Sequence, residues 1–184
     1  MIGVKKMKKL IVCSLCCSLT CICAMFNIQI GIVPISLVGL AVILSGALLG
    51  PVYGSISQIL YLLLVFIGFP FTSKLAGGPS YFAGPTAGYM IGYVFKAFIV
   101  GYIYYHFGKP CDSYFKRMFW FVVGAAIGTV VCLFIGSIWC YMVIYKKDFF
   151  SAIAAGSGPF LIGDSLKIVA VGLILPKLEK TLDL

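Results

Sequence analysis

The sequence predicts an all-α, polytopic membrane protein with six transmembrane helices. Of its 184 residues, 62% are hydrophobic and only 10% are charged, whereas a soluble domain carries about 25% charged residues. The apolar residues gather in six segments that approach the ~20 residues a helix needs to cross a bilayer. The connections are short and no polar block interrupts the chain, so we expect one integral membrane domain over residues 1–184.

The first three helices are expected at 9–27, 36–50 and 52–68. Four lysines lie within the first nine residues, directly before an apolar run, an arrangement that resembles a signal peptide. The apolar run is long for one, however, and lacks a small-residue cleavage pattern, so we expect a retained helix. The second and third helices are separated by Gly50-Pro51, which is typical of a helix end followed by a turn.

The remaining helices are expected at 85–107, 118–145 and 158–177, separated by charged or glycine- and proline-rich stretches. Gly84-Pro85 and Gly158-Pro159 are expected to open the fourth and sixth helices, because proline is favoured at the first helical position. Two helix amino termini, which carry partial positive charge, would then face the same side of the membrane.

The basic residues predict the orientation in the membrane. With a cytoplasmic amino terminus, the inner segments hold nine of the fourteen Lys and Arg residues and the outer loops hold three. Cytoplasmic loops carry the excess of positive charge, so we expect both termini in the cytoplasm. The net charge of +9 therefore reflects topology, and no nucleic-acid partner is expected.

A stripe of small residues runs along the first predicted helix. Cys13, Cys17 and Cys21 recur every four residues, with Ser14 and Ser18 beside them. Such stripes allow helices to pack closely, either within the bundle or against a partner membrane subunit. Cysteines inside apolar runs act as small hydrophobic residues, and no metal site is expected.

Asp164 and Lys167 place an acid and a base three residues apart inside a predicted span. A charge within the bilayer costs at least ~2.5–3.5 kcal/mol and is by default a candidate functional residue. At this spacing the two side chains lie on one helix face. They form either a structural ion pair between helices or part of a site for a small polar ligand.

Lys96 is the third charge inside a predicted span and lies about 16 Å below Pro85, at a depth comparable to that of Asp164 and Lys167. Its long stem either extends to the membrane interface or lines the same site. The sequence contains no phosphate-binding loop, no zinc-protease motif and no nucleophile elbow. It therefore predicts binding rather than catalysis, with no cofactor or metal in this chain.

Several segments together resemble the BioY family, the biotin-specific S components of energy-coupling-factor (ECF) transporters. The most specific are Gly84-Pro85-Thr86-Ala87-Gly88-Tyr89 and Pro159-Phe160-Leu161-Ile162-Gly163-Asp164-Ser165-Leu166-Lys167, with further matching segments at 31–37, 48–54 and 68–71. The resemblance covers nearly the whole chain. It implies an S-component fold in the bacterial cytoplasmic membrane that binds biotin from outside and mediates its uptake. It also implies partners, namely a transmembrane coupling subunit and two ATP-binding-cassette ATPases that use the ATP, although some members are thought to occur without them.

The resemblance also implies the binding site. The helix acid and base carry over to Asp164 and Lys167, and the glycine-proline motif carries over to Gly84, Thr86 and Tyr89. The loop at 29–36 corresponds to the family's lid and contributes Pro34 and Ser36. Lys96 is included in the site because its predicted depth in the membrane is comparable to that of Asp164 and Lys167.

In this interpretation Asp164 accepts from the ureido N–H groups of biotin, and Lys167 donates to the ureido oxygen or stabilises Asp164. One departure from the family is Val38, where members often have Gln. The alternatives are an S component for another vitamin and a non-transport membrane scaffold in which Asp164 and Lys167 form a structural bridge.

Overall fold

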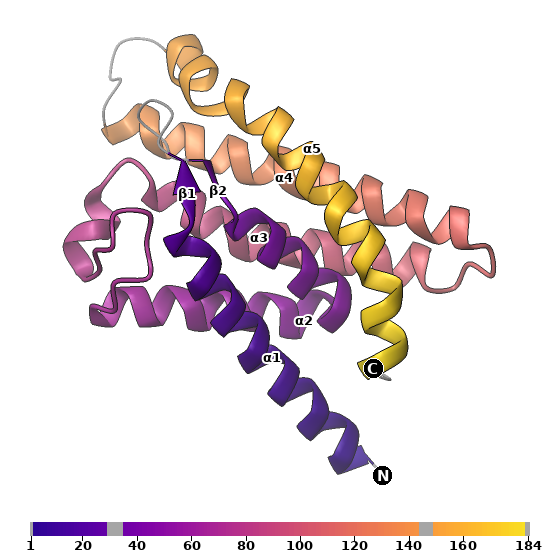
Figure 1. Ribbon diagram of the computed structural model, residues 1–184. Helices are drawn as coiled ribbons and strands as arrows, with labels where there is room; N and C mark the ends of the chain where they lie inside the picture. Colours follow the sequence, from indigo (N-terminus) through magenta and orange to yellow (C-terminus); the bar gives the residue numbers. More distant parts are fainter. Residues whose placement is uncertain (1, 29–34, 144–148, 183–184) are drawn as a thin grey trace.

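The structure is a computed structural model that describes residues 2–28, 35–143 and 149–182 (Figure 1). It confirms the all-α class, since its two strands have two residues each. The long helices are α1 (Ile2–Met25), α2 (Val38–Ile67), α3 (Ala87–Ile103), α4 (Tyr114–Val143) and α5 (Phe149–Leu182). The short elements are the antiparallel strands β1 (Asn27–Ile28) and β2 (Ile35–Ser36), the 3-10 turn η1 (Pro79–Ala83) and the π-helical turn η2 (Tyr104–Gly108).

Four helices in the described ranges are long and apolar enough to cross a membrane. These candidate spans are Lys6–Met25, Val38–Ile67, Ala87–Gly108 and Tyr114–Val143. With α5 as a fifth long helix, the fold is that of a multi-pass membrane protein.

Helix α2 doubles back on itself at Gly50. Gly50 has φ 79° and ψ −176°, a conformation that glycine adopts without steric cost, and Pro51 cannot donate the next backbone hydrogen bond. The side chains of Ser45 and Gln58 are only 3.0 Å apart, although residues thirteen apart in a straight helix are separated by about 20 Å. The two halves therefore pack antiparallel, where the sequence predicts two helices separated by Gly50-Pro51.

A buried polar cluster joins the α2 hairpin to α1. The Gln58 amide donates to Ser45 Oγ at 3.0 Å and to Ser57 Oγ at 3.1 Å, and it lies 3.4 Å from Thr20 Oγ1 on α1. All four side chains are fully buried. Each hydroxyl also donates to a carbonyl of its own helix. The cluster therefore satisfies the three hydroxyls and the Gln58 amide N–H groups within the apolar bundle, whereas Gln58 Oε1 has no hydrogen-bond partner among the described residues.

The small residues of α1 divide between two environments. Cys13, Cys17 and Cys21 are buried, whereas Ser14 and Ser18 are exposed and donate to carbonyls of their own helix. The cysteines therefore serve packing inside the bundle, and only the serine side of the predicted stripe is available to a partner.

Helices α3 and α4 interlock through glycines on both sides. A Cβ on Gly88 would collide with Trp139 of α4, and a Cβ on Gly136 would collide with the ring of Tyr89 of α3. Each large side chain thus occupies the space that a missing side chain leaves on the other helix, which brings the two backbones close together.

The turn η2 joins several elements at one end of the molecule. The Tyr105 hydroxyl donates to the Leu48 carbonyl at 2.6 Å, next to the α2 turn, and the Tyr104 hydroxyl donates to Glu179 on α5 at 3.0 Å. Lys9 of α1 lies over the ring of Tyr53, just beyond the same turn. Both ends of the chain therefore lie at this end of the bundle, as Figure 1 also shows.

The structure corrects the predicted starts of two helices. Helix α5 begins at Phe149, so Gly158-Pro159 lies inside it, and α3 begins at Ala87 after the N-cap residue Thr86. Neither Pro85 nor Pro159 is a first helical residue. The apolar, alanine-containing segment before Gly158 extends the helix, and an interior proline is tolerated in membrane helices because neighbouring groups satisfy the freed backbone.

The close approach of α3 to the α2 turn gives a first prediction. A Cβ on Gly101 would lie 2.5 Å from both Gly50 C and Pro51 N, and this backbone cannot move without opening the hairpin. We expect Gly101→Ala to lower the free energy of unfolding by roughly 3 kcal/mol or more, measured by denaturation in detergent micelles. In the control Gly124→Ala, the new Cβ meets the side chain of Ile103 at 3.2 Å, so the protein should fold normally. Equal stability of both variants would contradict this packing.

Candidate ligand-binding site

A cavity lies near the end of the bundle opposite to η2. About 670 Å³ of space free of protein atoms lies in and at the mouth of this cavity, open solvent included. Its walls come from every long helix and from the loop between α2 and α3. The lining residues among those described are Ala24, Ser36, Val38, Gly39, Tyr61, Ser73, Tyr81, Thr86, Tyr89, Met90, Tyr93, Lys96, Cys132, Leu133, Asp164 and Lys167.

Three charged side chains meet in the wall of this cavity, and we call them the ion triad. Asp164 Oδ1 accepts from Lys167 Nζ at 2.7 Å, and Asp164 Oδ2 accepts from Lys96 Nζ at 2.9 Å. Lys96 is 2% exposed, and Asp164 and Lys167 are each 7% exposed. The predicted pairing of Asp164 with Lys167 is confirmed. Lys96 lines the same site, so the alternative prediction, in which its side chain extends to the membrane interface, is wrong.

Among the described residues, the ion triad has unused hydrogen-bonding capacity and an unbalanced charge. A carboxylate offers about four acceptor positions and an ammonium group three donors. One donor of each lysine and two acceptor positions of Asp164 are occupied within the triad. The two lysines and one aspartate carry a formal charge of +1, which is costly to bury without a counter-charge. The site is therefore suited to a ligand that carries both donors and acceptors and is itself an anion.

The rest of the cavity wall is mostly apolar and aromatic. Val38, Met90 and Leu133 supply aliphatic surface, and the rings of Tyr89 and Tyr93 supply aromatic surface. Such a wall buries the hydrophobic part of a ligand, while the few polar groups fix its orientation.

Hydrogen bonds connect the segments at the outer edge of the cavity. Asn27 of β1 donates to the Ser73 carbonyl at 3.0 Å, and the Tyr61 hydroxyl donates to the Phe71 carbonyl at 2.9 Å. The hydroxyls of Ser73 and Tyr81 lie 3.4 Å apart. The loop between α2 and α3 is thus attached both to β1 and to the second half of α2.

The predicted site residues divide into three groups. Those brought together around the cavity are Asp164, Lys167, Lys96, Tyr89, Thr86 and Ser36. Gly84 is not among the described lining residues, and its carbonyl instead accepts from Trp139 Nε1 at 3.0 Å. Pro34 lies outside the described residues.

Other lining residues could not be identified from the sequence. Gly39, Cys132 and Leu133 have ordinary apolar neighbours in the sequence, and only the packing of α2 and α4 turns them toward the cavity. Tyr93 follows Tyr89 by four residues, so the two lie on the same helix face, and this spacing is the signal that could have placed Tyr93 at the site.

An apolar helical bundle with a charged cavity near one end defines a membrane-embedded small-molecule binding protein. The chain belongs to the BioY family, whose profile matches residues 2–184.

Relatives and solved structures agree with this assignment. The chain is 35% identical over 142 residues to the biotin transporter BioY of Rhizobium etli, covering 77% of this chain and 75% of that protein. It is 29% identical over 174 residues to the biotin transporter BioY of Thermotoga maritima, covering 95% and 97%. The crystal structure of the S-component for biotin from an ECF-type ABC transporter superposes with a TM-score of 0.82 at 26% identity, covering 98% of this chain and 95% of that chain.

A second solved structure, the S component of a bacterial ECF transporter, has the same fold. Its TM-score is 0.56 at 17% identity, covering 97% of this chain and 96% of that chain. The predicted S-component fold is therefore confirmed.

The charge imbalance predicts how the ligand-free protein responds to substitutions. Asp164→Asn leaves two buried lysines without a counter-charge, and we expect the free energy of unfolding to fall by about 3–5 kcal/mol. Lys96→Met leaves a neutral Asp164–Lys167 pair, so the free energy of unfolding should change by about 1 kcal/mol or less. Unfolding of both proteins in the same detergent tests this comparison, and a loss in Lys96→Met as large as that in Asp164→Asn would contradict it.

Proposed function

We propose that this chain binds biotin from the outer side of the membrane and mediates its uptake as an S component. The observation that carries the proposal is the ion triad in the cavity wall, which offers a carboxylate acceptor and ammonium donors side by side. Membership of the BioY family and the names of the relatives support it. A transport role requires no catalytic residue, and the chain is not an enzyme.

The ureido ring of biotin is the group that suits the triad. It carries two N–H donors, which can occupy the remaining acceptor positions of Asp164, and one carbonyl, which can accept from Lys96 or Lys167. A carboxylate, by contrast, has only acceptors and would be repelled by Asp164. We therefore place the ureido ring at the triad and the valerate tail toward the mouth of the cavity.

The biotin carboxylate would then lie near the amino terminus of α3. This helix end carries partial positive charge, and Thr86 lines the cavity there as the N-cap residue. Its hydroxyl makes no capping hydrogen bond within the described residues, which leaves it able to donate to the ligand. The net positive triad adds a longer-range attraction for the anion.

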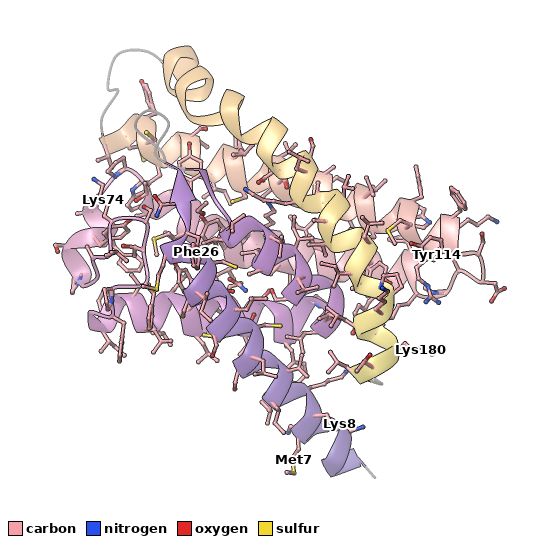
Figure 2. The ribbon with its side chains drawn as sticks, viewed as in Figure 1. Met7, Lys8, Phe26, Lys74, Tyr114 and Lys180 are labelled. Carbon is pink, nitrogen blue, oxygen red and sulfur yellow. The ribbon has the colours of Figure 1, made fainter. Side chains whose placement is uncertain are left out.

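In the membrane we propose six crossings within one domain of residues 1–184, with α2 contributing two of them. An even number of crossings returns the chain to its starting side, in agreement with the contacts that place both chain ends beside η2. Figure 2 shows Lys8 and Lys180 far from Lys74, which lies beside the cavity end. The excess of positive charge marks the cytoplasmic side, so both termini are cytoplasmic and the cavity opens outward.

The energy for uptake would come from other subunits. We propose that the chain works with an ECF transmembrane coupling subunit and two ABC-type ATPases, since an S-component structure from an ECF-type transporter is its structural neighbour. The chain itself holds no cofactor in this proposal, and biotin is its ligand.

Biotin binding to the purified protein tests the site. Asp164→Asn should weaken binding by about 100-fold, because it leaves two buried lysines without a counter-charge and removes the acceptor for the ureido N–H groups. Lys167→Met should weaken binding by a similar factor, because it removes an ammonium donor for the ureido oxygen, although Asp164 stays paired with Lys96. Asp112→Asn and Lys116→Met serve as matched controls, since both residues are exposed and lie outside the cavity. The assignment fails if both test variants bind biotin with unchanged affinity.

Uptake in cells tests the partners. Cells that make this chain together with an ECF coupling subunit and its two ATPases should accumulate labelled biotin faster than cells that make the chain alone. The same accumulation in both would contradict the need for these partners, and no accumulation in either would contradict the uptake function.

A further inference from the structure

Two glycines pack against residues of the ion triad. Gly39 lies in the first turn of α2 and lines the cavity, and Gly128 lies in the middle of α4. Both are buried. A helix is less stable with glycine in its interior than with alanine. The presence of glycine at each position therefore needs an explanation outside the helix itself.

At Gly39 the reason is the approach of α2 to the charged atoms. A Cβ added there would lie 3.3 Å from Asp164 Oδ1, 3.4 Å from Lys167 Cδ and 3.5 Å from Lys167 Nζ. A methyl group at this position would lie in contact with the Asp164 carboxylate and the Lys167 ammonium group, where the described residues leave them facing the cavity. It would replace polar contacts to a ligand by an apolar one, which is unfavourable for buried charges.

At Gly128 the reason is the path of the Lys96 side chain. A Cβ added there would lie 3.1 Å from the Lys96 carbonyl oxygen, 3.3 Å from Lys96 Cγ and 3.3 Å from Val100 Cγ2. These distances are shorter than ordinary van der Waals contacts, so the stem of Lys96 would have to shift. The Lys96–Asp164 hydrogen bond of 2.9 Å tolerates only a few tenths of an ångström before it weakens.

We propose that Gly39 and Gly128 are positioning residues for the ligand, because their missing side chains fix where the triad places its free donors and acceptors. This inference rests on the proposed function for the identity of the ligand. Gly39 keeps the Asp164–Lys167 side of the triad open to the cavity, and Gly128 lets Lys96 reach Asp164 from α3.

The chain offers two matched controls. Gly124 lies one turn before Gly128 on α4, and a Cβ there would meet Ile103 Cβ at 3.2 Å. Gly172 lies on α5, the helix of Asp164 and Lys167, and a Cβ there would meet Met118 Sδ at 3.1 Å. Both are buried and equally crowded, but their neighbours are outside the cavity lining.

The first measurement is the affinity of the purified proteins for biotin, together with the melting temperature without ligand. Gly39→Ala and Gly128→Ala should bind biotin about tenfold more weakly or worse, and should melt within the range of Gly124→Ala and Gly172→Ala, which bind normally. Test variants that bind as tightly as the controls overturn the proposal. Failure of the test variants alone to fold also counts against it, because the glycines would then be needed for the fold itself.

The second measurement needs no ligand. Unfolding free energies of Gly128→Ala, Lys96→Ala and the double variant should be non-additive, because the substitution at 128 acts through the Lys96 side chain. Gly124→Ala and Lys96→Ala should be additive. Additivity at position 128 overturns the positioning role, whereas absence of biotin binding in the unsubstituted protein overturns only the proposed ligand.

Discussion

The constraint on which the structure depends is one acid held between two bases in the interior of an apolar bundle. Asp164 is bound by Lys167 from its own helix and by Lys96 from α3. Either lysine alone would neutralise it, and the second leaves a formal charge of +1 in a region where charge is expensive. A protein that needed only stability would not retain this excess. We interpret it as the cost of a site that attracts an anionic ligand and can both donate and accept hydrogen bonds.

The packing of the helices serves this arrangement. The α2 hairpin, the interlocked glycines of α3 and α4 and the tie between η2 and α5 hold the backbones close together around the bundle. Hydrophobic attraction between helices is weak in lipid, so such close approach and internal hydrogen bonds provide much of the association energy. These contacts lie beside η2 and along the bundle, and the described cavity lies near the opposite end.

The sequence predicted the local parts of this structure and missed those that depend on tertiary packing. The Asp164–Lys167 contact followed from a spacing of three residues on one helix, and the turn at Gly50-Pro51 followed from the chemistry of that dipeptide. Lys96 could not be assigned, because its partner lies 68 residues away and its direction depends on the rotation of α3 against α5. Pro85 and Pro159 were predicted to be first helical residues, and neither is. The preference of proline for that position is local, and the residues around each proline set the helix start elsewhere. Nothing in the sequence around Gly39 or Cys132 indicates a binding site. Both line the cavity because the packing of α2 and α4 turns these residues toward it.

The most direct test of the account is the structure of the protein with biotin bound. The account predicts the ureido N–H groups at about 3 Å from Asp164 carboxylate oxygens, the ureido oxygen at a similar distance from Lys96 or Lys167, and the carboxylate near Thr86. A ligand bound away from the triad, or with its carboxylate against Asp164, would contradict it.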